Sequence, residues 1–91
     1  MKPFSGKTVV VTGGGSGIGL ATARKFAEQG ATVILAEKSE ETGSAAEQRL
    51  NDAGLSAIFV PTDVSVEADV ERMVRTAVER TGRLDVLVNN A

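Results

Sequence analysis

Short apolar runs alternate along the chain with segments of helical periodicity. Runs typical of buried strands lie at residues 9–11, 33–35, 56–61 and 84–88. The segments between them predict helices from Gly17 to about Gln29, after Ser39 to Gly54, and after Ser65 to Gly82. This βαβαβαβ order predicts an α/β fold with a parallel sheet and right-handed crossovers.

Local features define the helix boundaries. Ser39 and Ser65 are predicted to cap the second and third helices, because serine hydroxyls accept bonds from free N–H groups there. Gly30 and Gly82 suit the left-handed position that follows a helix. Gly43 lies inside the second helix and costs about 1 kcal/mol relative to alanine, so this helix has the weakest local support.

The expected strand order is 3-2-1-4, the first half of a Rossmann-like, doubly wound sheet. In such a sheet the direction of the crossovers reverses between strands one and four. Ligands bind there, beyond the carboxyl ends of the strands. The glycine-rich turn, Glu37, Asp63 and Asn90 all follow strand ends, so the order predicts that they meet in one crevice.

The first strand leads into five glycines within seven positions: Gly13, Gly14, Gly15, Gly17 and Gly19. Glycine has no Cβ, so this turn can take positive φ and lie directly against a ligand. The helix that follows supplies free N–H groups and the positive end of its dipole. This combination predicts a site for a phosphate group.

The glycine pattern distinguishes among nucleotide-binding motifs. It does not match GxGxxG, because Ile18 stands at the third glycine position counted from Gly13. It is not a P-loop either, because Leu20 stands where the phosphate-binding lysine would be. It fits TGxxxGxG, beginning at Thr12, and here the chain resembles the short-chain dehydrogenase/reductase family. The resemblance extends over all 91 residues, with Asp63-Val64 after strand three and Asn89-Asn90-Ala91 matching the NNAG segment except for its last glycine.

The resemblance implies a role for each matched residue in binding NAD or NADP. The pyrophosphate would be wrapped by the glycine turn, at Gly13, Ser16, Gly17, Ile18 and Gly19. Asp63 would accept a hydrogen bond from the adenine amino group, and the Val64 amide would donate to the ring. Asn90, followed by Ala91, would support the cofactor ribose and brace strand four against strand one. The alternatives are a plain tight turn, a helix-capping aspartate and a structural asparagine.

Glu37 bears on which cofactor is preferred. A carboxylate at the end of strand two can accept bonds from both hydroxyls of the adenosine ribose. A 2′-phosphate there would face a like charge, at a cost of about 4 kcal/mol for unit charges about 4 Å apart at an effective dielectric near 20. Lys38 favours NADP instead, whereas Ser16 leaves neutral a second position that is often basic in NADP-using relatives. NAD is therefore the expected cofactor, with NADP possible.

Composition limits the remaining function classes. The net charge is −2, with 24% charged residues of mixed sign, which favours neither nucleic acid nor a membrane surface as partner. The chain has no cysteine and no histidine, so neither a disulfide framework nor a metal site is expected. The first residues lack the apolar core of a signal peptide. A cytoplasmic location is the default expectation.

No catalytic residue can be assigned. In the family, a tyrosine acts as acid/base and a lysine four residues later lowers its pKa, both after the NNAG segment. This chain contains no tyrosine. We therefore expect residues 1–91 to be the N-terminal part of one NAD(P)-binding domain in a longer oxidoreductase, inactive alone. The alternatives are a stand-alone module for a dinucleotide or adenine nucleotide, and a truncated piece that serves for interaction.

Strand four has no predicted neighbour on its far side. One face of the sheet would carry two helices and the other face a single helix. Apolar surface and a bare strand edge would then be exposed. The sequence therefore predicts that the chain self-associates through this edge or is only marginally folded.

Overall fold

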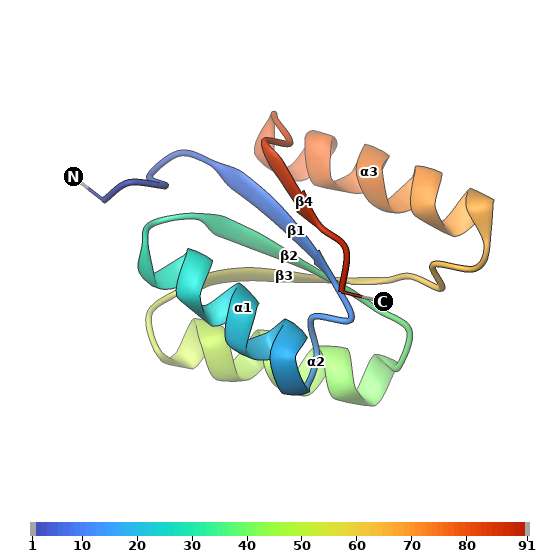
Figure 1. The fold of residues 1–91 in the computed structure, drawn as a ribbon, viewed down its shortest axis with the longest axis horizontal. Coiled ribbons are helices and arrows are strands. Elements are labelled where there is room, and N and C mark those ends of the chain that lie inside the picture. The colour runs from blue at the N-terminus through green and yellow to red at the C-terminus, as the bar shows by residue number, and fades with distance from the viewer. Residues whose placement is uncertain (1, 91) are drawn as a thin grey trace.

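The computed structural model describes residues 2–90 as a four-stranded sheet with helices on both faces (Figure 1). The cofactor contact predicted at Ala91 lies outside the described residues. In chain order the elements are β1 (Thr8–Thr12), α1 (Gly17–Glu28), β2 (Thr32–Glu37), α2 (Glu40–Asp52), β3 (Ser56–Pro61), α3 (Glu67–Thr81) and β4 (Val86–Val88).

All neighbouring strands are parallel, in the order β3-β2-β1-β4. Both the predicted fold class and the predicted strand order are therefore confirmed. In the register, Val10 of β1 lies between Ile34 of β2 and Leu87 of β4. Helices α1 and α2 lie on one side of the sheet and α3 on the other (Figure 1).

The core has one apolar cluster on each face of the sheet. On the α1 and α2 side, Val9, Val11 and Leu35 pack against small helix residues such as Ala23 and against Leu50. On the α3 side, the cluster comprises Val10, Ile34, Ala36, Val60, Met73 and Ala77. Every residue of β1 is buried, as expected for a central parallel strand that is covered on both faces.

Two predictions about boundaries are wrong. Strand β4 covers only Val86–Val88 rather than residues 84–88, because Asp85 uses its carboxylate to accept the N–H of Thr8. Helix α3 has Val66 at its N-cap, without a side-chain cap, whereas Ser65 was the predicted cap. The Ser65 hydroxyl instead donates to the carboxylate of Asp63, at 2.6 Å.

Helix α2 forms although Gly43 interrupts it. Ser39 caps it as predicted, because its hydroxyl accepts the N–H of Thr42 at 3.2 Å. Gly43 is buried, and a Cβ built there would collide with the ring of Phe59 on β3. Glycine at this position therefore lets the helix lie close to the sheet.

The outer edge of β3 is closed by helix side chains. Asn51 exchanges two hydrogen bonds of 3.0 Å with the backbone of Ala57, and Glu47 accepts the N–H of Phe59 at 2.7 Å. Pro61 has no N–H, and Arg72 donates to its carbonyl at 2.7 Å. These contacts occupy most of the backbone groups that β3 turns away from β2.

Candidate functional site

The glycine-rich turn between β1 and α1 requires glycine at specific points. Gly13 and Gly17 have φ of 64° and 56°, a region that other residues seldom adopt. Gly19 has no room for a side chain, because its Cβ would collide with the carbonyl of Gly13. The turn is tied to β2 by a bond of 2.8 Å from the N–H of Gly13 to the carbonyl of Ala36.

The first turn of α1 presents N–H groups without a side-chain cap. Ser16 is the N-cap residue, and its side chain makes no capping bond. The N–H of Leu20 bonds to the Ser16 carbonyl, so the N–H groups of Gly17, Ile18 and Gly19 precede the first helical bond. Uncapped N–H groups at the positive end of a helix are suited to an anion. Ile18 is 77% exposed, so its side chain contributes little to the packing of the turn.

The carboxylate of Glu37 contacts the glycine turn directly. Its Oε1 accepts the N–H of Gly15 and its Oε2 accepts the N–H of Ser39, each at 3.1 Å. Lys38 points along the same edge of the sheet and forms an ion pair with Asp63, with 3.5 Å between Nζ and Oδ2. The end of β2 is thus linked to the glycine turn on one side and to the segment after β3 on the other.

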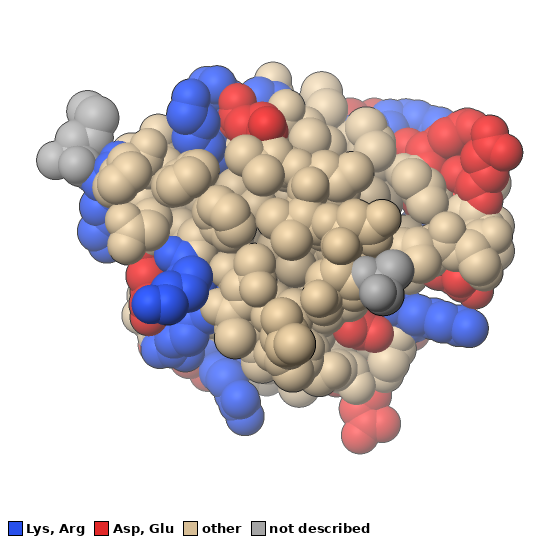
Figure 2. Space-filling view, in the orientation of Figure 1, with Lys and Arg blue, Asp and Glu red and all other residues tan. Residues whose placement is uncertain are grey.

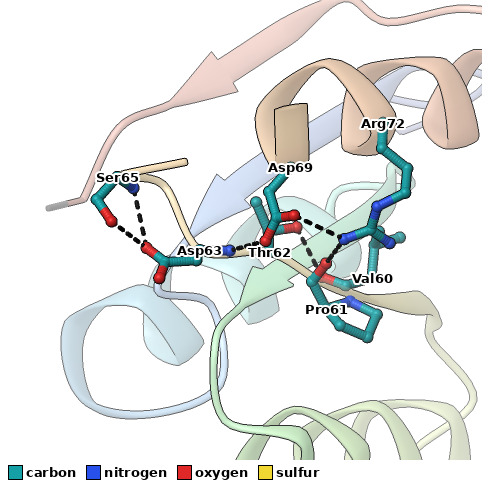
Figure 3. Close-up of polar contacts among 7 residues, drawn as sticks. All are labelled: Val60, Pro61, Thr62, Asp63, Ser65, Asp69 and Arg72. Atoms are coloured by element: carbon teal, nitrogen blue, oxygen red, sulfur yellow. Dashed lines mark hydrogen bonds and ion pairs between the residues drawn. The ribbon is translucent and has the colours of Figure 1, made fainter. Parts of the chain in front are cut away.

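Asp63 follows β3, and polar contacts on both sides hold it in place (Figure 3). Its Oδ1 accepts both the N–H and the hydroxyl of Ser65, at 3.0 and 2.6 Å. These bonds, with a smaller contribution from Lys38, hold the pKa of the Asp63 carboxyl below its usual value. The group is therefore an anion that turns toward the start of α3.

Two residues of α3 fix the backbone that carries Asp63. Asp69 accepts the N–H of Asp63 at 2.9 Å (Figure 3). Arg72 donates to the carbonyl of Pro61 and forms an ion pair with Asp69, in which nitrogen and oxygen are 3.4 Å apart. Thr62 is buried, and its hydroxyl donates to the carbonyl of Val60 at 2.9 Å. The position of Asp63 thus depends on residues up to nine positions further along the chain.

Asn90 joins the end of β4 to the end of β1. Its N–H donates to the hydroxyl oxygen of Thr12 at 2.8 Å. Its side-chain nitrogen lies close to the glycine turn, since a Cβ on Gly19 would come within 2.9 Å of it. Asn90 therefore braces β4 against β1 and the turn.

A cleft of about 150 Å³ lies at the carboxyl ends of the strands, and it brings together five of the predicted site residues: Gly13, Glu37, Asp63, Val64 and Asn90. The other predicted residues of the glycine turn, Ser16, Gly17, Ile18 and Gly19, do not line it. Its lining includes Thr12, Gly13, Ala36, Glu37, Lys38, Thr62, Asp63, Val64 and Asn90. A larger hollow of about 450 Å³ lies at the opposite ends of the strands, near Lys7 and Arg80. It contains none of the predicted site residues. Because ligands of doubly wound sheets bind at the carboxyl ends, the smaller cleft is the candidate site.

Residues 2–90 contain neither a cluster of metal ligands nor a membrane-spanning helix. No three side chains among His, Cys, Asp and Glu gather there as metal ligands would. None of the described helices has the length and apolar character to cross a membrane.

Comparison with known proteins shows the family. A family model described as short chain dehydrogenase matches residues 7–91. The chain belongs to the short chain dehydrogenase family. It is 55% identical over 88 residues to an uncharacterized oxidoreductase of Thermotoga maritima and 47% identical over 88 residues to an L-fucose dehydrogenase of Rattus norvegicus. Each alignment covers 97% of this chain, but only 34% and 31% of those relatives.

Solved structures agree with this assignment. The crystal structure of a hydroxysteroid dehydrogenase from Escherichia coli matches with a TM-score of 0.94 and 30% identity, over 97% of this chain and 37% of that one. The chain spans about a third of the length of these relatives. The chain corresponds to the Rossmann nucleotide-binding portion of this family. This assignment is favoured over a stand-alone module for a dinucleotide or adenine nucleotide and over a piece that serves for interaction.

The candidate site contains contacts that the sequence pattern did not reveal. The bond from Gly15 to Glu37, the role of Thr12 in holding Asn90, and the support of Asp63 by Asp69 and Arg72 all join separate elements. No spacing rule relates such residues along the chain. Asp69 lies three positions after the observed N-cap, Val66, but four after Ser65, the predicted cap, so the spacing of a capping box did not indicate it.

Proposed function

We propose that residues 1–91 form the N-terminal part of a single NAD(P)-binding domain, in an oxidoreductase that moves hydride between a nicotinamide cofactor and an alcohol or carbonyl group. The observation that carries this proposal is the glycine turn. Its uncapped N–H groups lie at the switch point of a short chain dehydrogenase sheet. When bound, the cofactor supplies the hydride chemistry, and this chain supplies the binding groups.

The proposed cofactor contacts follow the polarity of the cleft. The pyrophosphate would lie against the glycine turn at Gly13, Ser16, Gly17, Ile18 and Gly19, with the uncapped N–H groups of Gly17, Ile18 and Gly19 as donors. The space beside Gly17 supports this position, because a Cβ there would have no heavy atom within 4 Å. Asp63 and Val64 would contact the adenine, and Asn90 would support the ribose.

NAD is proposed in preference to NADP. Glu37 would accept bonds from the adenosine ribose, and its charge would repel a 2′-phosphate. Lys38, the nearest cation on that strand end, is drawn toward Asp63 by an ion pair. Ser16 adds no positive charge to the turn. The balance of charge around the end of β2 therefore favours a cofactor without the extra phosphate.

A titration with NADH tests the binding proposal. Backbone amide signals of the turn, followed by NMR, should shift on adding NADH to the wild-type chain. They should shift far less in Gly17→Val, which fills the proposed phosphate position. Gly54→Val is the matched control. Gly54 also has positive φ, 81°, and open space around its Cβ, but it lies at the end of α2 away from the cleft.

The control separates backbone strain from loss of the phosphate site. Both variants place a β-branched residue at positive φ, so both lose comparable stability. Binding should be lost only in Gly17→Val. Equal affinity of wild type and Gly17→Val for NADH would contradict the proposed phosphate site.

We also propose that the chain self-associates through β4. Leu87 is 53% exposed and Val78 of α3 is 44% exposed, both on the side of the sheet that α3 covers only in part. Figure 2 shows uncharged residues across the middle of the face on which β4 lies, with charged residues mainly around its margin. An apolar surface beside a short edge strand favours pairing with another strand.

A further inference from the structure

The carboxylate of Glu37 is anchored by one backbone donor at each oxygen. Gly15 donates to Oε1 and Ser39 donates to Oε2, both at 3.1 Å. The first donor belongs to the glycine turn and the second to the start of α2. Hydrogen bonds from N–H groups to a carboxylate are stronger than those between neutral groups, so the side chain is held against rotation.

Space rather than backbone conformation makes glycine necessary at position 15. Gly15 is buried and is not among the glycines with positive φ. A Cβ built there would lie 2.8 Å from Oε1 and 2.9 Å from Cγ of Glu37, and 2.9 Å from the methyl group of Thr42. These separations are shorter than van der Waals contact. Any side chain at position 15 would therefore press on both the carboxylate of Glu37 and the methyl group of Thr42. The carboxylate, at the end of a flexible side chain, is the group that we expect to move.

We propose that Gly15 is a specificity-determining residue, which selects NAD over NADP by leaving the space in which Glu37 docks on the glycine turn. This inference rests on the proposed function of the cleft. It assigns the preference for NAD to Gly15 and Glu37 together, because the carboxylate of Glu37 can discriminate between NAD and NADP only where the glycine turn holds it.

Anchoring explains why a flexible side chain can discriminate between the two cofactors. A glutamate that is free to rotate can turn away from a 2′-phosphate and so avoid most of the repulsion. A glutamate fixed by two backbone bonds must break them first, and breaking them leaves two N–H groups without their acceptor. The same bonds keep its oxygens in place for two ribose hydroxyls.

The decisive experiment is a double-mutant cycle on positions 15 and 37, with the dissociation constants of NADH and NADPH measured by NMR titration. Gly15→Ala should weaken NADH binding by about tenfold, which corresponds to one hydrogen bond to a charged group. It should leave NADPH binding unchanged or improved. In a Glu37→Ala background, Gly15→Ala should change neither constant, because the carboxylate that it displaces is gone.

A second variant removes the other contact of the added methyl group. Thr42→Ser keeps the hydroxyl that bonds to Ser39 but lacks the methyl group near Gly15. Gly15→Ala should still weaken NADH binding about tenfold in this background. A full recovery of affinity would show that pressure on α2, rather than displacement of Glu37, caused the loss.

The outcomes separate this inference from the proposed function. Two results would overturn the role of Gly15 while the binding site stands, provided that wild type binds NADH. In one, Gly15→Ala weakens the binding of NADH and NADPH equally. In the other, Gly15→Ala weakens NADH binding as much in the Glu37→Ala background as in wild type. If wild type binds neither cofactor, while circular dichroism shows it folded, the proposed function fails and the inference fails with it.

Discussion

The two outer edges of the sheet differ in whether side chains form hydrogen bonds to their outward backbone groups. On β3, Asn51, Glu47 and Arg72 bond to the backbone at Ala57, Phe59 and Pro61. At β4, the N–H of Asp85 donates to the carbonyl of Thr8 on β1. Because successive residues of a strand point their backbone groups to opposite sides, the N–H and carbonyl of Val86 point away from β1. Within residues 2–90, no side chain bonds to these outward groups. One edge is closed and the other is open.

The difference indicates in which direction the sheet can grow. Edge strands in native proteins are protected by side chains, by proline or by charge, and β3 has all three kinds of protection. Strand β4 has three residues, and its middle residue, Leu87, is apolar and exposed. The candidate cofactor cleft lies across the carboxyl ends of all four strands, and Asn90 after β4 forms part of its lining. An element that paired with β4 would therefore lie beside this end of the cleft.

The largest effect is expected where α2 supports the closed edge. Leu50 is fully buried, so Leu50→Ala should lower the free energy of unfolding by about 3 kcal/mol. Val78→Ala, on the helix beside the open edge, should lower it by about 0.5 kcal/mol, since Val78 is 44% exposed. Urea denaturation measures both. Similar losses in the two variants would contradict the proposed difference between the edges.

Gly43→Ala tests how closely α2 must approach β3. Alanine favours a helix over glycine by about 1 kcal/mol, but its Cβ would collide with the ring of Phe59. Overpacking of this kind costs about 1–3 kcal/mol, so we expect a net loss of about 1 kcal/mol. Ser44→Ala, at the exposed neighbouring position, should stabilise the chain by a few tenths of a kcal/mol. Thermal unfolding would show opposite shifts, and a stabilising Gly43→Ala would contradict the packing argument.

The sequence predicted most of the fold because its elements have strong local patterns. The valines of β1, the glycines after it and the periodicity of α3 each identify an element within a few residues. The cap of α3 was mispredicted because Asp63 takes the hydroxyl of Ser65, and β4 is shorter because Asp85 turns to Thr8. Such competition between neighbouring polar groups depends on three-dimensional positions.

The candidate site was predictable only in part, for a similar reason. Strand ends placed Gly13, Glu37, Asp63 and Asn90 together, and these four residues line the cleft with Val64. The rest of the predicted glycine turn, from Ser16 to Gly19, does not line it. The sequence did not indicate that Glu37 would bond to Gly15 or that Asp69 would hold Asp63. Each of these bonds joins a side chain to a backbone N–H of another segment. Every residue except proline has such an N–H, so the sequence does not indicate which one a side chain will bond to.

The smallest effect on monomer stability, and the most direct test of the open edge, is expected from Leu87→Lys. Leu87 is 53% exposed, so lysine should change the free energy of unfolding by less than about 0.5 kcal/mol. It should nevertheless reduce self-association, because a charged side chain on an edge strand disfavours pairing with a second strand. Ser56→Lys is the matched control, since it adds the same charge at an exposed position on the closed edge. Sedimentation velocity should show smaller species only for Leu87→Lys, and an equal change in both variants would attribute association to net charge rather than to β4.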